Sequence, residues 1–167
     1  MKRTQLGEDR LSEDEIGAWK GMLRAHRDLV VSLDSQLERE HSLPLSSYEV
    51  LMVLADSPHG RARMSEIAEE LILSRSGLTR LVDRLVRDGW VERTPCEDDA
   101  RGLYAAITPS GLAKLRHARP AHLDGVREDF ISRLSDADLE ALARVWTKLE
   151  DRAGQAASGT GSPTSKP

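Results

Sequence analysis

The chain has 167 residues, a formal net charge of −4 and a single cysteine, Cys96. Its length fits one compact domain or two small lobes rather than a large enzyme. A single cysteine excludes an internal disulfide and a cysteine-rich zinc site. The chain lacks the excess of basic residues that many nucleic-acid-binding proteins have. Contact with phosphates, however, depends on where the arginine and lysine residues lie rather than on their total number. No apolar run approaches the ~20 residues that span a bilayer and no signal-peptide core follows the charged N-terminus, so we expect a cytoplasmic protein without a membrane partner.

The first predicted element is a long helix over residues 12–42, which follows a flexible N-terminus over 1–11. Ser12 and Glu15 have the spacing of a capping box, in which two donors at the helix start are satisfied reciprocally. The apolar side recurs in steps of four and three, at Trp19, Leu23, His26, Val30, Leu33 and Leu37. So long a stripe predicts a helical partner, and we expect this helix to dimerise.

A second helix, which contains Tyr48, follows the interruption at Pro44. We expect Ser46 or Ser47 to cap it, because a serine hydroxyl accepts from a free N–H group at a helix start. The helix should end near residues 57–60, where proline and glycine interrupt the pattern. Residues 61–64 are expected to be a short connector.

Two short helices in tandem come next and predict a helix-turn-helix. Ser65 is expected to cap the first, and Ile72 and Leu73 to form the turn. The second helix is predicted over 74–88, with Ser74 as its cap and Gly89 at its stop.

One side of this second helix is apolar, and the other is rich in arginine and hydroxyl groups. Arg80, Arg84 and Arg87 fall in one sector, from which guanidinium groups reach phosphates or pair with guanine. Hydroxyl groups lie toward the N-terminal end, at Ser74, Ser76 and Thr79, and suit a phosphate or a base edge. A solvated surface helix is the alternative, and we favour a DNA-recognition helix.

A β-hairpin is predicted over 90–108, because two runs of β-forming residues flank a polar turn. Asp98, Asp99 and Arg101 lie at its tip. A carboxylate two residues before an arginine can hold the guanidinium extended, and an extended arginine fits the minor groove. The alternative is a surface ion pair worth at most about 1 kcal/mol.

Helices are predicted over 109–152, with Thr108 and Pro109 at the start and Ser135 capping the last one. Pro120 should kink the first of them, and a hinge there is a hypothesis beside a static kink. Residues 153–167 are rich in Gly, Ser, Thr and Pro and are expected to be a disordered tail.

Residues 64–111 resemble the MarR family of bacterial regulators. The segments that carry the resemblance are SEIAEEL, SRSGLTRLVDRLVRDGWVERTP and DARGLYAAITPSG. The resemblance implies a mainly α-helical fold with a small β-hairpin (α+β): a winged helix-turn-helix lobe over 46–108, and long helices that form an intertwined homodimer interface. It also implies binding to a pseudo-palindromic DNA operator and repression relieved by a small molecule.

Several residue roles come from this resemblance alone. Arg101 would enter the minor groove with Asp99 orienting it, and the segment from Ser74 to Arg80, Arg75 included, would face the major groove. Family members commonly bind aromatic or phenolic ligands between the DNA lobe and the dimer helices, where the candidates are His26, Tyr48 and Met52. The alternative for each of these three is ordinary core packing.

Other functions fit the sequence less well. No arrangement of nucleophile, base and orienting group predicts an enzyme, and nothing selects a cofactor or a metal ion. A redox-responsive regulator acting through Cys96 is one alternative, although the acidic residues that follow would raise the pKa of the thiol. A helical dimer that binds a protein partner is another, supported by the net negative charge.

Overall fold

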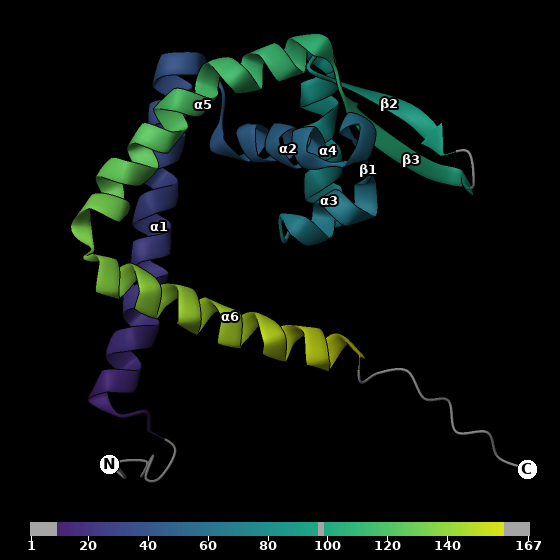
Figure 1. Cartoon of the computed structure of the whole chain (residues 1–167). Helices are drawn as coiled ribbons and strands as arrows, with labels where there is room; N and C mark the ends of the chain where they lie inside the picture. Colours follow the sequence, from purple (N-terminus) through teal and green to yellow (C-terminus); the bar gives the residue numbers. More distant parts are fainter. Residues whose placement is uncertain (1–9, 97–98, 159–167) are drawn as a thin grey trace, which may run out of the picture. The chain divides into compact units, whose positions relative to one another are not determined.

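The structure, a computed structural model, describes residues 10–96 and 99–158, with the backbone alone at 96, 99–102 and 150–158. The chain divides into two compact units, residues 1–126 and 127–167. The elements of the first unit are, in chain order, α1 (Glu13–His41), α2 (Leu45–Asp56), the 3-10 turn η1 (Pro58–Gly60), β1 (Arg61–Arg63), α3 (Met64–Glu70), α4 (Arg75–Arg87), β2 (Val91–Cys96), β3 (Asp99–Ile107) and most of α5 (Pro109–Asp129). The predicted class, mainly helical with a small sheet, is confirmed (Figure 1).

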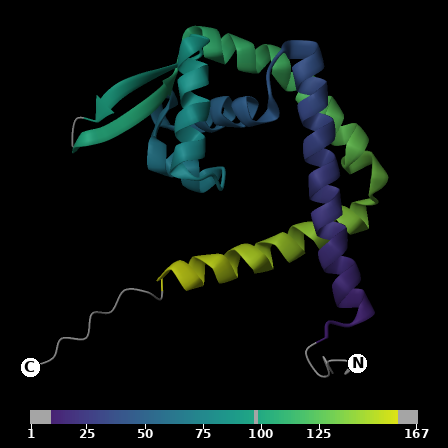
Figure 2. The same ribbon diagram turned by 180° about the vertical axis from the view of Figure 1, so that it is seen from behind.

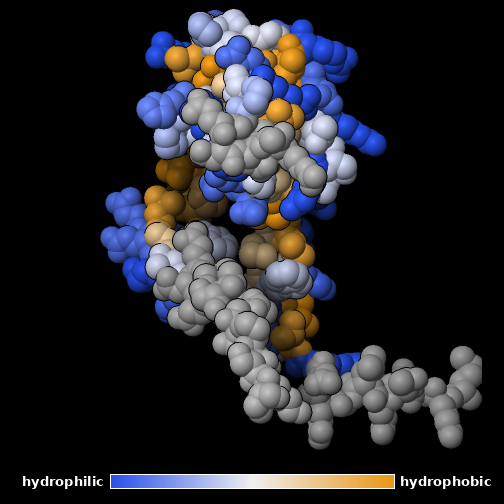
Figure 3. All heavy atoms as spheres, turned by 90° about the vertical axis from the view of Figure 1, so that its right-hand side faces the viewer, coloured by the Kyte–Doolittle hydropathy of each residue, from blue (hydrophilic) through white to orange (hydrophobic). Residues whose placement is uncertain are grey.

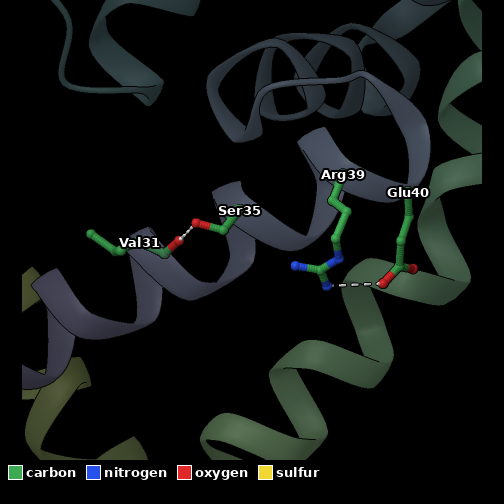
Figure 4. A network of polar contacts seen from close by, with 4 residues as sticks. All are labelled: Val31, Ser35, Arg39 and Glu40. Atoms are coloured by element: carbon green, nitrogen blue, oxygen red, sulfur yellow. Dashed lines mark hydrogen bonds and ion pairs between the residues drawn. The ribbon is translucent and has the colours of Figure 1, made fainter.

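Helix α1 begins as predicted. The Glu15 N–H donates to Ser12 Oγ at 3.2 Å, and the Ser12 N–H donates to Glu15 Oε2 at 2.7 Å, so the capping box is complete. Further along, polar groups on exposed positions bond within the helix itself: Ser35 Oγ donates to the Val31 carbonyl at 2.7 Å, and Arg39 pairs with Glu40 at 3.3 Å (Figure 4).

Helices α1 and α5 lie side by side in the first unit (Figures 1 and 2). Gly125 on α5 is buried, and a Cβ atom there would stand 2.3 Å from Gln36 Oε1 and 2.8 Å from Leu33 Cδ2 on α1. A larger residue at position 125 would therefore require the ends of the Gln36 and Leu33 side chains to move. The ribbon of α5 bends along its length, as predicted from Pro120, which lies inside it (Figure 2).

Two predicted helix caps are wrong. Pro44 is the N-cap of α2, and the serines at 46 and 47 lie within its first turn; Ser47 is fully buried. The Leu45 N–H donates instead to Asp34 Oδ1 on α1, at 2.8 Å. Helix α3 begins at Met64 and leaves Ser65 inside it, while Glu66 Oε2 accepts from the Arg63 N–H at 2.8 Å. In both cases a carboxylate, rather than a serine, satisfies an N–H group at the helix start.

The predicted connector at 61–64 is also wrong. Residues 61–63 form β1, which pairs antiparallel with β3, and β3 pairs with β2, so the strand order is β1-β3-β2. On the sheet face turned away from buried Ala62 and Ala105, the guanidinium carbons of Arg61 and Arg63 lie 4.8 Å and 5.5 Å from the centre of the Tyr104 ring. Three residues without a β-branched side chain give no strand signal of their own; the pairing with β3 creates the strand.

The end of α4 and the start of α5 are held tightly together. Thr108 caps α5 by accepting from the Gly111 N–H at 3.0 Å, and its hydroxyl donates to the Gly89 carbonyl at 2.7 Å. Lys114 Nζ donates to the His41 carbonyl at the end of α1, at 2.6 Å, and lies 4.8 Å from the centre of the Trp90 ring. This lysine therefore connects the end of α1 to the turn that follows α4.

The core of the first unit is aliphatic and lies between α2, α3, α4, the sheet and the ends of α1 and α5. Its largest fully buried members include Leu37, Leu43, Tyr48, Leu51, Leu54, Ile67, Leu78 and Leu85. Burial of these side chains fixes α4 in the lobe.

In the second unit, η2 (Ile131–Arg133) precedes α6 (Asp136–Ser158). Ser135 caps α6, because its hydroxyl accepts from the Asp138 N–H at 3.3 Å. Helix α6 continues to Ser158, past residue 153, where the tail was expected to start. None of the helices in the described ranges is long and apolar enough to cross a bilayer.

Candidate nucleic-acid interface

The N-terminal end of α4 presents hydroxyl and guanidinium groups to solvent. Ser74 is the N-cap, as predicted, and its Oγ accepts from the Gly77 N–H at 3.1 Å and lies 3.3 Å from Ser76 Oγ. Thr79 Oγ1 donates to the Arg75 carbonyl at 2.8 Å. Five side chains at this end are exposed, those of Ser74, Arg75, Ser76, Thr79 and Arg80. Because Leu78, Leu81, Val82 and Leu85 are buried on the opposite side, this exposed surface is held in a fixed orientation.

The arginines of α4 separate into two groups. Arg75, Arg80 and Arg87 are exposed, and none of them pairs with a carboxylate of the described residues. Arg84 points inward: its Nη2 donates to Ser47 Oγ on α2 at 3.1 Å, and its Nε is buried without a described partner. The prediction that Arg84 shares the outer face is therefore wrong. A helix turns about 100° per residue, so Arg84 is displaced about 40° from Arg80 toward the buried side at Leu81.

An ion pair attaches the hairpin to α4. Arg93 Nη1 on β2 lies 2.6 Å from Asp83 Oδ1, so the one acidic side chain within α4 is engaged by the sheet. Periodicity along the sequence does not predict this pair, because its partners are ten positions apart and the end of α4 and the turn after it lie between them. Side chains of a strand point alternately to opposite faces, so Arg93 lies on the same face of the sheet as the buried Val91.

The hairpin is formed as predicted, with Val91 opposite Ile107 and Thr94 opposite Tyr104, and with an irregularity between Pro95 and Cys96. Its tip lies outside the described residues: Asp98 entirely, and the side chains of Cys96, Asp99 and Arg101. The predicted roles of these residues therefore remain predictions.

The three candidate effector residues do not meet in one cavity. Tyr48 is buried, and its ring centre lies 4.4 Å from that of His122 on α5. Burial raises the pKa of Tyr48 and lowers the pKa of His122. Met52 lines a hollow of about 300 Å³ with Val53, Asp56, Ser57, Ala62, Glu66 and Glu70. His26 is exposed on α1. Burial raises the pKa of Glu49, and the nearby His26 acts in the opposite direction and lowers it.

No group of three or more metal-ligating side chains is present in the described part of the chain. His41 and His117 lie edge to face with their ring centres 5.0 Å apart. Two imidazoles without a third ligand do not form a typical zinc site.

Comparison with known proteins gives a consistent result. A model of the MarR family matches residues 41–102. The chain is 34% identical to Sco3205, a MarR family transcriptional regulator from Streptomyces coelicolor solved in complex with DNA; the match covers 85% of this chain and 89% of that chain, with a TM-score of 0.80.

Two curated relatives match over a shorter length. The multiple antibiotic resistance protein MarR of Salmonella typhimurium is 40% identical over 86 residues, which are 50% of this chain and 58% of that protein. The transcriptional repressor YetL of Bacillus subtilis is 28% identical over 105 residues, 61% of this chain and 63% of that protein. The matches thus span less than two thirds of either curated relative.

Proposed function

Because the chain belongs to the MarR family, we propose that it is a transcriptional regulator that binds double-stranded DNA with α4 in the major groove. The observation that carries the proposal is the exposed end of α4, where arginine and hydroxyl side chains stand over a buried apolar face and Asp83 is engaged by Arg93. Exposed guanidinium groups without carboxylate partners are available to phosphates and guanine edges.

The proposed contacts follow from this surface and from the family. In the major groove they are Ser74, Arg75, Ser76, Thr79, Arg80 and Arg87, and at the wing they are Asp99 and Arg101. Arg84 is left out of this set, because its guanidinium lies against Ser47. Its proposed part is to hold α4 on α2.

The proposal includes a homodimer, supported by α1. Its apolar stripe is continuous, but only the C-terminal part is buried within the chain: Leu37 is 0% exposed, whereas Trp19 is 54% and Leu23 46% exposed. Figure 3 shows uncovered apolar side chains, in orange, on one face of the molecule. A second copy that covers the exposed half of the stripe would bury large apolar side chains at little cost, since nearby polar groups stay in water.

Repression is the proposed direction of regulation, because YetL is named a transcriptional repressor. Release by a small aromatic or phenolic ligand is the further part of the proposal, with His26, Tyr48 and Met52 as the first positions to substitute. Two-fold symmetry would place the two recognition helices about 34 Å apart, on half-sites one helical turn apart.

The decisive experiment selects a DNA site from a random pool with the full chain and then measures affinity as a function of salt. We expect the logarithm of the association constant to fall by about 0.9 per phosphate contacted for each tenfold rise in salt. Arg80→Ala and Arg101→Ala should each cost roughly 1–3 kcal/mol of binding free energy. Arg39→Ala, which removes an exposed arginine of α1 paired with Glu40, is the matched control and should bind as wild type does. Full affinity in both DNA-face variants would refute the proposal.

A further inference from the structure

The turn between α3 and α4 has an unusual residue. Ile72 adopts the left-handed backbone conformation, with φ of 51°, and is 92% exposed. A β-branched side chain in this conformation is strained, and turns of this kind normally use glycine or asparagine. An exposed isoleucine also gains nothing from burial. Within the chain, both features are unfavourable and no described contact offsets them.

The position of Ile72 suggests where the compensation lies. Ile72 is two residues before Ser74, so the two Cα atoms are at most ~7 Å apart. The turn backbone is fixed on both sides, because the Ile72 N–H donates to the Glu69 carbonyl at 3.2 Å and the Leu73 N–H donates to the Ala68 carbonyl at 2.8 Å. The isoleucine is thus held at the exposed N-terminal end of α4, beside the hydroxyl and arginine groups described above.

We propose that Ile72 is a specificity-determining residue, whose side chain packs against the C5-methyl group of a thymine at the edge of each half-site. The inference rests on the proposed DNA-binding function. In the major groove thymine alone presents a methyl group, and aliphatic side chains recognise it by apolar contact. This contact would bury the Ile72 side chain only in the complex with DNA. It therefore accounts for an apolar residue at a position where that residue destabilises the free protein.

The test replaces thymine by deoxyuridine, which lacks only that methyl group, at one position at a time in the selected duplex. Wild-type affinity should fall about fourfold at one thymine per half-site, the value for one buried methyl-sized group. Ile72→Asn removes the contact in both half-sites of the proposed dimer, so it should bind the thymine duplex about sixteenfold more weakly and lose all sensitivity to deoxyuridine at that position. Ile72→Leu, which keeps an aliphatic side chain, should retain the sensitivity.

A thermal unfolding measurement without DNA separates this role from a structural one. Ile72→Asn should unfold at the same temperature as wild type or a higher one, because asparagine tolerates the left-handed conformation. His59→Asn is the matched control: His59 has φ of 58°, and the adjacent Gly60 lies against Ile107, near the other end of α4. It should also be neutral or stabilising, but leave DNA affinity unchanged.

Specific outcomes would overturn the inference. They are wild-type binding that is insensitive to deoxyuridine at every position, equal sensitivity in wild type and Ile72→Asn, or an Ile72→Asn variant that is less stable but binds the thymine duplex normally. Absence of any sequence-specific, salt-dependent binding by wild type would overturn the proposed function together with this inference, and so is distinguishable from failure of the methyl contact alone.

Discussion

His122 on α5 is a half-buried titratable side chain. Its ring packs on Tyr48 and its Nδ1 is buried without a described partner. Burial, and then the positive charge of Arg119, lower its pKa below the ordinary value of 6.5. The folded protein thus holds this imidazole neutral at pH values where the unfolded chain would already protonate it.

The first prediction concerns the pH dependence of stability. Since the unfolded chain binds the proton first, the free energy of unfolding should fall as the pH drops below about 6.5 and continue to fall down to the lowered pKa of the folded state. His122→Phe removes this titration and should lose less stability between pH 7.5 and pH 5 than wild type. Urea unfolding at the two pH values measures the difference, and equal losses in both proteins would contradict the prediction.

At the scale of elements, the junction between α4 and α5 depends on Gly111, near the start of α5. Gly111→Ala places a methyl group against the backbone carbonyl of Trp90, which cannot rotate away as a side chain can, and should destabilise the protein by about 1–3 kcal/mol. Gly17→Ala, in α1 with nothing within 4 Å of the added methyl group, is the control and should stabilise by roughly 0.5–1 kcal/mol. Denaturant unfolding checks both values. A Gly111→Ala variant as stable as wild type would contradict this prediction.

The elements that could be predicted from sequence are those determined by local chemistry. Ser12, Ser74 and Thr108 cap helices as expected, because a cap involves only residues three or four positions away. Strand β1 could not be predicted, because its three residues become a strand only when β3 pairs with them. The same distinction explains Ser65, which lies inside α3 because β1 leads directly into that helix.

For the candidate site, the apolar face of α4 and the exposed hydroxyl end could be predicted from a period of 3.6 residues. The inward turn of Arg84 could not, since Ser47 is its partner and lies 37 positions earlier in the chain. The Asp83–Arg93 pair has the same origin. Periodicity assigns a residue to a side of a helix, but at the boundary of that side the neighbouring elements decide which way a long side chain points.

For the whole molecule, the prediction concerns assembly. Trp19→Ser or Leu23→Ser removes a large apolar side chain from the exposed half of the α1 stripe and should shift the protein toward the monomer. Val31→Ser is the matched control, because Val31 is exposed on α1 but lies about a quarter turn or more from the stripe. Sedimentation velocity over a range of concentrations measures the shift.

DNA binding gives this prediction a second readout. A monomer engages a single half-site, so the stripe variants should bind the selected duplex much more weakly than wild type, with a smaller salt dependence. Their α4 surface is unchanged. Monomeric variants with full affinity would contradict both the dimer and the spacing expected for two recognition helices.

The pairing of β1 with β3 also bears on how the lobe forms as the chain is made. It joins Arg61, which precedes α3 and α4, to Ala106, which follows the hairpin. Helices α3 and α4 can begin to form from local contacts alone, but the lobe closes only after β3 has been synthesised, and this closure is the slower, non-local step. A nascent chain that ends before β3 would carry α4 without the completed sheet that packs beside it, and would present the proposed DNA-binding surface only after β3 has paired.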